Sequence, residues 1–340
     1  MASFYYLKVD VFLNSSYHCV LLLPPSFLPV CGQAPSNYKI VGGEDAVHGS
    51  WPWQVRLEFK KGLCGGSLIN ENWVLSAAHC FPSDTQINTS EITVKLVMES
   101  LVGPNLDMQQ MNVSDVFVYK AYDPVNNEND IALVKLSSSV TFTNFIRPVC
   151  LAGEKDSLPN DIYVWVTGWG RTNHSSKCSK MGRTKVGFNI KIYVGKSLSW
   201  VSTGDQLVEK LQEVQVRIIS NSDCASMYGL LSITDKMICA GFTEGEKDSC
   251  TGDSGGPMVV RLNKSWTQFG IVSSGKSCAL PNYPGVYTRV SQYQDGINKT
   301  ISNGQLGFVT FLFSHHIYSI LFCLFFYFSI IPFLFSISVF

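Results

Sequence analysis

A serine between glycines is the strongest chemical signal in the sequence. The hexapeptide GDSGGP runs from Gly252 to Pro257 and contains Ser254. A serine hydroxyl is a weak nucleophile, so it needs a base that takes its proton and backbone N–H groups that stabilise an oxyanion. Neighbouring glycines let the backbone turn tightly and approach a substrate carbonyl. The motif therefore predicts nucleophilic catalysis at Ser254 rather than an ordinary glycine-rich turn.

Two other segments contain candidates for the base and for a residue that orients it. The segment SAAHC contains His79, and a disulfide between Cys64 and Cys80 could fix the position of its ring. The segment NDIALVKL places Asp130 at the start of an apolar run, where a buried carboxylate needs a partner. The order histidine, aspartate, serine is that of chymotrypsin-type catalytic triads. We therefore predict that His79, Asp130 and Ser254 act together.

Short strands must position these residues. Between residues 40 and 301 the chain alternates apolar and β-branched runs with Gly, Pro and Asn turns, which indicates an all-β sandwich or barrel. Residues 290–301 could form a short closing helix, and no internal repeat is visible. Examples of the expected strands are 53–59, 67–77, 91–98, 130–136, 163–170, 211–219, 257–262, 269–274 and 285–290.

Composition argues against several classes of function. Lys plus Arg and Asp plus Glu both number 26 in the 340 residues, so no net charge favours nucleic acid as a partner. The eleven cysteines include no CxxC and no Cys/His cluster with zinc spacing, so we expect disulfides in an oxidising compartment and no metal site. Six Asn-x-Ser/Thr sequons agree with this expectation: Asn14, Asn88, Asn112, Asn173, Asn263 and Asn298.

The two ends differ from the middle. Residues 1–30 are interpreted as a secretory leader, because 20–30 form a short apolar run of signal-peptide size. Residues 306–340 contain no charged side chain other than histidine, and 317–340 could cross a bilayer. No basic residues follow, so a removable signal for a lipid anchor fits better than a transmembrane helix with a cytoplasmic tail. A buried core helix is the alternative.

One basic segment interrupts the β-rich pattern. Between Arg171 and Gly204 there are six basic residues and no acidic residue, and Cys178 lies among them. We interpret the part at about 175–200 as a long solvated loop, with absence from the mature protein as the alternative. The six basic residues are Lys177, Lys180, Arg183, Lys185, Lys191 and Lys196.

Taken together, the motifs from Ile40 to about Ile301 resemble the trypsin/chymotrypsin family, near its tryptase-, prostasin- and testisin-like members. The resemblance implies two six-stranded antiparallel Greek-key β-barrels with the site between them, a short C-terminal helix and no cofactor. It also implies that Ser254 attacks the scissile carbonyl, that His79 takes its proton, and that Asp130 orients the imidazole. The N–H groups of Gly252 and Ser254 would form the oxyanion hole.

The resemblance also implies activation by cleavage. IVGG begins at Ile40, so residues 31–39 would be a propeptide that an activating trypsin-like protease cuts after Lys39. The new amino group of Ile40 would then pair with Asp253, next to the nucleophile.

A specificity pocket for Lys or Arg follows from the same comparison. Asp248 lies six residues before Ser254 and matches the pocket base, with Ser249 beside it. Gly275 and Gly285 match the pocket walls, and Ser273 matches a residue beside the buried aspartate.

The family pattern further implies four disulfides: Cys31–Cys150, Cys64–Cys80, Cys224–Cys239 and Cys250–Cys278. Cys19, Cys178 and Cys323 are left over, and Val164 and Val260 occupy both positions of another common bridge. Two further departures are Ser274 and Gly296, which replace tryptophans of the family; Ser274 would enlarge or weaken the adjacent apolar subsites.

The sequence thus predicts a secreted or cell-surface serine endopeptidase that cuts after Lys or Arg and meets serine protease inhibitors. Two alternatives remain. One is a non-catalytic binding protein on the same scaffold, although the complete triad argues against it. The other is an esterase of the α/β-hydrolase type, whose nucleophile lies in GxSxG but precedes its histidine.

Overall fold

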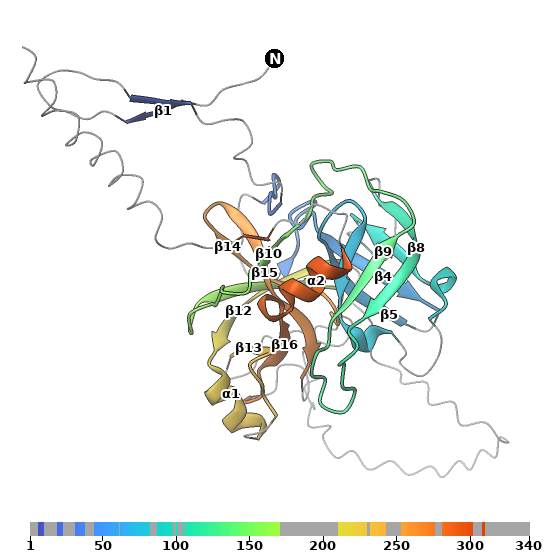
Figure 1. Ribbon diagram of the computed structural model, residues 1–340, viewed down its shortest axis with the longest axis vertical. Coiled ribbons are helices and arrows are strands. Elements are labelled where there is room, and N and C mark those ends of the chain that lie inside the picture. Colours follow the sequence, from blue (N-terminus) through green and yellow to red (C-terminus); the bar gives the residue numbers. More distant parts are fainter. Residues whose placement is uncertain are drawn as a thin grey trace, which may run out of the picture.

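The computed structural model consists chiefly of two β-barrels packed together (Figure 1). It describes residues 6–9, 19–22, 31–37, 44–60, 62–81, 87–97, 100, 105, 107–170, 210–229, 232–242, 253–275, 281–301 and 308–309.

The first barrel is closed and has the strand order β4-β5-β6-β9-β8-β7. All of its pairings are antiparallel, and β7 returns to pair with β4 while β9 pairs with β6. Val55 and Leu57 of β4 are fully buried in its core, whereas Arg56 between them lies on the other face of the strand and is partly buried, as strand alternation requires. The strands are β4 (Gln54–Phe59), β5 (Gly62–Leu68), β6 (Trp73–Ser76), β7 (Thr93–Leu96), β8 (Gln109–Val118) and β9 (Ala132–Leu136).

The second barrel follows the order β14-β11-β12-β13-β16-β15 and closes through pairing of β14 with β15. Val164 and Val260, at the positions of the missing disulfide, are buried in its apolar cluster. The strands are β11 (Tyr163–Gly168), β12 (Gln212–Ile219), β13 (Met237–Gly241), β14 (Pro257–Leu262), β15 (Ser265–Ser274) and β16 (Gly285–Arg289). The all-β prediction of two six-stranded barrels is confirmed.

Aromatic rings and buried polar pairs join the barrels. Trp51 and Trp53, which lie just before β4, contact Trp266 of β15 with ring centroids 5.0 and 6.2 Å apart. Ser67 Oγ donates to Gln268 Oε1 at 2.5 Å across the same junction. Removing one such buried ring costs about 3–5 kcal/mol, so this junction fixes how the barrels face each other.

Helices are few and short. The closing segment consists of the 3-10 turn η4 (Val290–Tyr293) and α2 (Gln294–Thr300), as predicted, and its Ile297 and Ile301 join the first-barrel core cluster. The helix α1 (Asn221–Tyr228) was not predicted; the side chain of Ser220 caps it by accepting from the N–H of Asp223.

Three disulfides among the described residues are those that the family resemblance implied: Cys31–Cys150, Cys64–Cys80 and Cys224–Cys239. Cys250 and Cys278 lie outside the described residues. Each of the three bonds joins segments at least 15 positions apart, so each restricts the unfolded chain.

Smaller strands complete the description. β3 (Glu44–Asp45) pairs with β12, and β10 (Cys150–Ala152) pairs in parallel with β15 and with β17 (Phe308–Val309). Within residues 1–30, β1 (Tyr6–Val9) pairs with β2 (Cys19–Leu22). None of the described helices is long and apolar enough to span a membrane; apart from β17, residues 306–340 lie outside the described part.

Candidate active site

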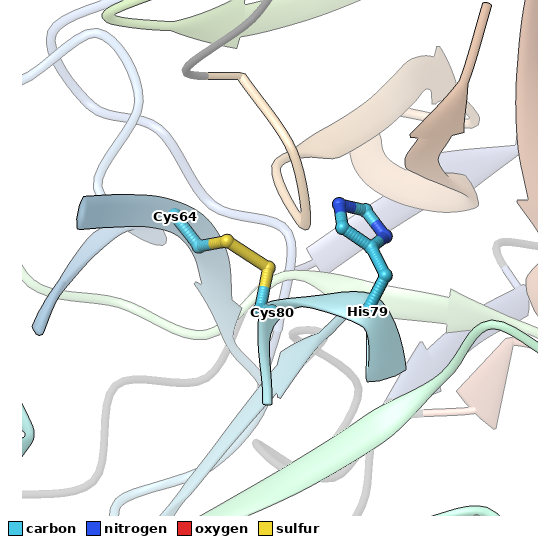
Figure 2. Close-up of side chains that lie close together, drawn as sticks. All are labelled: Cys64, His79 and Cys80. Carbon is cyan, nitrogen blue, oxygen red and sulfur yellow. A yellow bond between two sulfur atoms is a disulfide. The ribbon is translucent and has the colours of Figure 1, made fainter. Parts of the chain in front are cut away.

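His79 lies in a one-turn 3-10 helix, η2 (Ala78–Cys80), which is separated from the end of β6 only by Ala77. The disulfide from Cys80 to Cys64 of β5 ties this turn to the neighbouring strand, and Figure 2 shows the imidazole projecting from the turn beside the bond. The side chain of His79 is 25% exposed, so the ring is held at its base and open to solvent at its tip.

The same three side chains could superficially suggest a metal site. Ligand atoms of Cys64, His79 and Cys80 lie within 4.8 Å of one another. The two sulfurs are bonded to each other, however, and a disulfide offers no thiolate to a metal. This grouping is therefore a structural staple beside a histidine.

Asp130 provides the hydrogen-bond acceptor beneath the ring, and its side chain is fully buried at 0% exposure. Its Oδ1 accepts from the backbone N–H of His79 at 2.8 Å, and its Oδ2 lies 2.7 Å from His79 Nδ1. Ser273 Oγ of β15 donates to the same Oδ2 at 2.5 Å. Three donors thus compensate the buried negative charge, which would otherwise be costly to remove from water.

These contacts determine the tautomer of His79. An ionised carboxylate can only accept hydrogen bonds, so Nδ1 must carry a proton and Nε2 of the neutral ring is left as an acceptor. This is the state required of a general base for a serine hydroxyl.

Nearby, burial raises the pKa of Tyr122 to about 12, and the charges of Asp130 and Asp123 add to the effect.

Ser254 lies in a tight turn immediately before β14, packed against the first barrel. Its carbonyl oxygen accepts from the N–H of Gly65 at 2.7 Å and lies 3.8 Å from Cys80 Sγ. The nucleophile candidate therefore adjoins the disulfide that ties down the His79 turn. Residues from both barrels meet here, although 175 positions separate His79 from Ser254 in the sequence.

The turn after Ser254 requires glycine. Gly255 has φ +80°, and a Cβ there would lie 2.3 Å from Ser76 Oγ and 2.6 Å from the Gly65 carbonyl. Its N–H donates to the carbonyl of Val272 at 2.8 Å. Only a residue without a side chain allows this approach between the barrels.

Asp253 is held by a different pair of glycines. The N–H of Gly170 donates to Asp253 Oδ1 at 2.7 Å. A Cβ on Gly168 would lie 2.0 Å from the same oxygen, and a Cβ on Gly170 would lie 2.3 Å from Oδ2. The segment 167–170 thus forms a close cradle for the carboxylate next to the nucleophile candidate.

We predict that Gly168→Ala displaces Asp253 and lowers the catalytic rate at Ser254 about 10- to 100-fold, because small errors in positioning have such effects. Overpacking should also destabilise the fold by about 1–3 kcal/mol. The checks are kcat/KM and the midpoint of thermal unfolding. Gly62→Ala is the matched control, since a Cβ there would meet nothing within 4 Å. Equal effects of the two substitutions would contradict the cradle.

The remaining predicted site residues are only partly described. Lys39, Ile40, Asp248, Ser249 and Gly252 lie outside the described residues. Ser273, which was expected beside the buried aspartate, donates to Asp130 as given above.

The predicted pocket walls lie on neighbouring strands. Ser274, the last residue of β15, is opposite Val286 of β16. Gly275 follows the end of β15, and Gly285 is the first residue of β16. They therefore lie at adjacent strand ends. Ser274 itself is half-buried.

Several residues that support the site were missed by the sequence analysis. Thr288 Oγ1 of β16 donates to the carbonyl of Asp130 at 2.8 Å. The N–H of Gly65 donates to the carbonyl of Ser254 in the serine turn, and Gly168 and Gly170 both contact Asp253. Glycine pairs in CGG and TGWG were the available signals, but a pattern of glycines does not say which segment approaches them.

Two β-barrels with a buried Asp–His pair at their junction and a serine on the adjoining turn define the architecture of a serine peptidase. A comparison with protein-family models matches the trypsin family over residues 40–190 and 193–297. The chain therefore belongs to the trypsin family, whose members are serine peptidases.

Proposed function

We propose that this chain is a trypsin-like serine endopeptidase that hydrolyses peptide bonds after Lys or Arg through His79, Asp130 and Ser254. The observation that carries the proposal is the fully buried Asp130 carboxylate, which holds His79 in the tautomer of a general base. His79 takes the proton of Ser254 as the hydroxyl attacks the carbonyl, and returns it to the leaving amine. The N–H groups of Gly252 and Ser254 stabilise the oxyanion.

Activation by cleavage after Lys39 is part of the proposal. The new ammonium group of Ile40 pairs with Asp253, whose carboxylate adjoins the Ser254 turn. Cys31 is bonded to Cys150, and Gly32 exchanges backbone hydrogen bonds with the barrels, donating to Pro148 and accepting from Trp266. This attachment supports a propeptide, residues 31–39, that stays tethered to the protease domain, residues 40–301, after cleavage.

The proposed specificity depends on Asp248 at the base of the pocket, with Ser249 beside it. A carboxylate there attracts the cation of a Lys or Arg side chain, and Gly275 and Gly285 leave room for its length. Partners are accordingly peptides with these residues, an activating trypsin-like protease and serine protease inhibitors. With Ser274 in place of tryptophan, apolar residues further along the substrate should contribute little to binding.

The proposal also includes the cellular location of the protein and its subtype within the family. The disulfides support an extracellular, secretory protein. We propose a leader in residues 1–30, N-glycans at some of the sequons, and cell-surface attachment through residues 306–340 by a lipid anchor or a single span, as in tryptase-, prostasin- and testisin-like enzymes.

The test uses the full chain, secreted from a eukaryotic cell and cut with a trypsin-like protease that is then removed. We expect Arg- and Lys-amide substrates to be hydrolysed and a Phe-amide to be left intact, with Asp248→Ser abolishing the preference. A Lys39→Ala chain should stay inactive under the same treatment. On a gel, the cut chain should separate into two pieces only after reduction.

A cleaved, folded protein that neither hydrolyses these amides nor labels with a fluorophosphonate probe would refute the enzymatic proposal. That outcome would favour a binding protein on a protease scaffold.

A further inference from the structure

The residue immediately before Asp130 has an unusual backbone conformation. Asn129 has φ +59° and is only 5% exposed. Positive φ is disfavoured for residues with a side chain, although asparagine tolerates it better than most. Such a conformation persists when the surrounding structure holds it in place.

The side chain of Asn129 is hydrogen-bonded at both ends. Its Nδ2 donates to the carbonyl of Ala121 at 2.8 Å, within the same loop of the first barrel. Its Oδ1 accepts from Lys236 Nζ at 2.8 Å and from the hydroxyl of Tyr293 at 3.2 Å. The amide is thereby fixed between its own loop and two donors from elsewhere in the chain.

Both donors come from outside the first barrel. Lys236 directly precedes β13 of the second barrel, and its ammonium group also lies 3.9 Å from a carboxylate oxygen of Glu128. Tyr293 ends the 3-10 turn η4, and its ring packs edge-on against Tyr119 with centroids 5.2 Å apart. Burial raises the pKa of Tyr293, so its hydroxyl remains a donor at every physiological pH.

Asp130 itself is also held by residues of the second barrel. Thr288 of β16 binds its carbonyl and Ser273 of β15 binds its carboxylate. Asp130 belongs to the first barrel by sequence, but its orientation depends on the second barrel. Fixing Asn129 removes the remaining freedom of the backbone on its N-terminal side.

We propose that Lys236 and Tyr293 are positioning residues for peptide hydrolysis: they clamp the Asn129 side chain, hold its left-handed backbone and so aim the Asp130 carboxylate at His79. This inference rests on the proposed triad. Among the described residues, Lys236 contacts Asn129 and Glu128, and Tyr293 contacts Asn129 and Tyr119. Their effect therefore passes through Asn129 and Asp130. Because Lys236 and Tyr293 lie outside the first barrel, the clamp also makes the alignment of the triad depend on how the rest of the fold docks against that barrel.

The experiment compares Lys236→Met, Tyr293→Phe and the double variant in the cleaved full chain. Rates on an Arg-amide are divided by the concentration of sites that react with a fluorophosphonate, so that only folded protein is counted. We expect kcat to fall about 10-fold in each single variant and up to about 100-fold in the double variant. KM should stay unchanged, because the interaction affects the reacting groups rather than the substrate pocket.

Conservative and matched variants sharpen the result. Lys236→Arg keeps a cationic donor and should restore kcat to near the wild-type value. Asn129→Gly should retain more activity than Asn129→Ala, since glycine adopts positive φ without steric cost. Lys155→Met and Tyr163→Phe, at exposed positions, should leave kcat unchanged.

The inference is overturned if Lys236→Met and Tyr293→Phe keep wild-type kcat per active site, including the case in which only their unfolding temperature falls. Failure of Lys236→Arg to restore kcat would also count against it. Should Lys236→Met fail to fold, Tyr293→Phe carries the same test, because it removes a single oxygen and keeps the packed ring. Wild-type protein without Ser254-dependent hydrolysis would instead refute the proposed function.

Discussion

Ser254→Ala is expected to reduce kcat on the order of 10⁶-fold while leaving the fold intact. The substitution removes the hydroxyl that forms the acyl-enzyme. It leaves the hydrogen bond from Gly65 in place, because that bond uses the backbone carbonyl of residue 254. Initial rates on an Arg-amide, fluorophosphonate labelling and thermal unfolding measure these effects separately.

Groups that act as a unit show non-additive losses. The double variant His79→Ala/Ser254→Ala should therefore be no slower than Ser254→Ala alone. Ser138→Ala, at an exposed position just after β9, is the matched control and should be as active as the wild type. Additive losses in the double variant, or retained labelling in Ser254→Ala, would show that another residue is the nucleophile.

Asp130→Asn should lower kcat about 10⁴-fold at neutral pH with little change in KM. The asparagine amide can donate to Nδ1 of His79, which shifts the ring proton to Nε2 and leaves no acceptor for the serine proton. Replacing the carboxylate also leaves some of its three donors poorly paired, so unfolding should become easier by about 1–3 kcal/mol.

The measurement for Asp130→Asn is kcat and KM per titrated active site. Asp115→Asn, which is exposed on β8, is the control for the change of charge and should be without effect. A loss of less than tenfold in Asp130→Asn would contradict the assigned role of the buried carboxylate.

The sequence correctly predicted several strands where apolar residues recur along the chain. The expected strands at 130–136 and 163–170 correspond to β9 and β11, whose residues are almost all buried. The expected ranges did not include β8, which carries polar residues on both faces and is specified by pairing with β7 and β9. They also left out β13, although all five of its residues are buried. The sequence analysis also missed α1, whose short polar sequence depends on the Ser220 cap and the Cys224–Cys239 bond.

By itself the sequence determined the chemistry on offer: a serine among glycines, a histidine next to a cysteine and an aspartate at the start of an apolar run, in the order of one family. Residue types and local spacing suffice for this, because a motif is a property of neighbouring residues. Only the tertiary structure decided which donors surround Asp130 and which glycines receive Asp253 and the serine turn. Ser273, Thr288, Lys236 and Tyr293 reach the loop at 129–130 across more than a hundred positions of chain, and contacts of that kind arise from the packing of two barrels rather than from any local pattern.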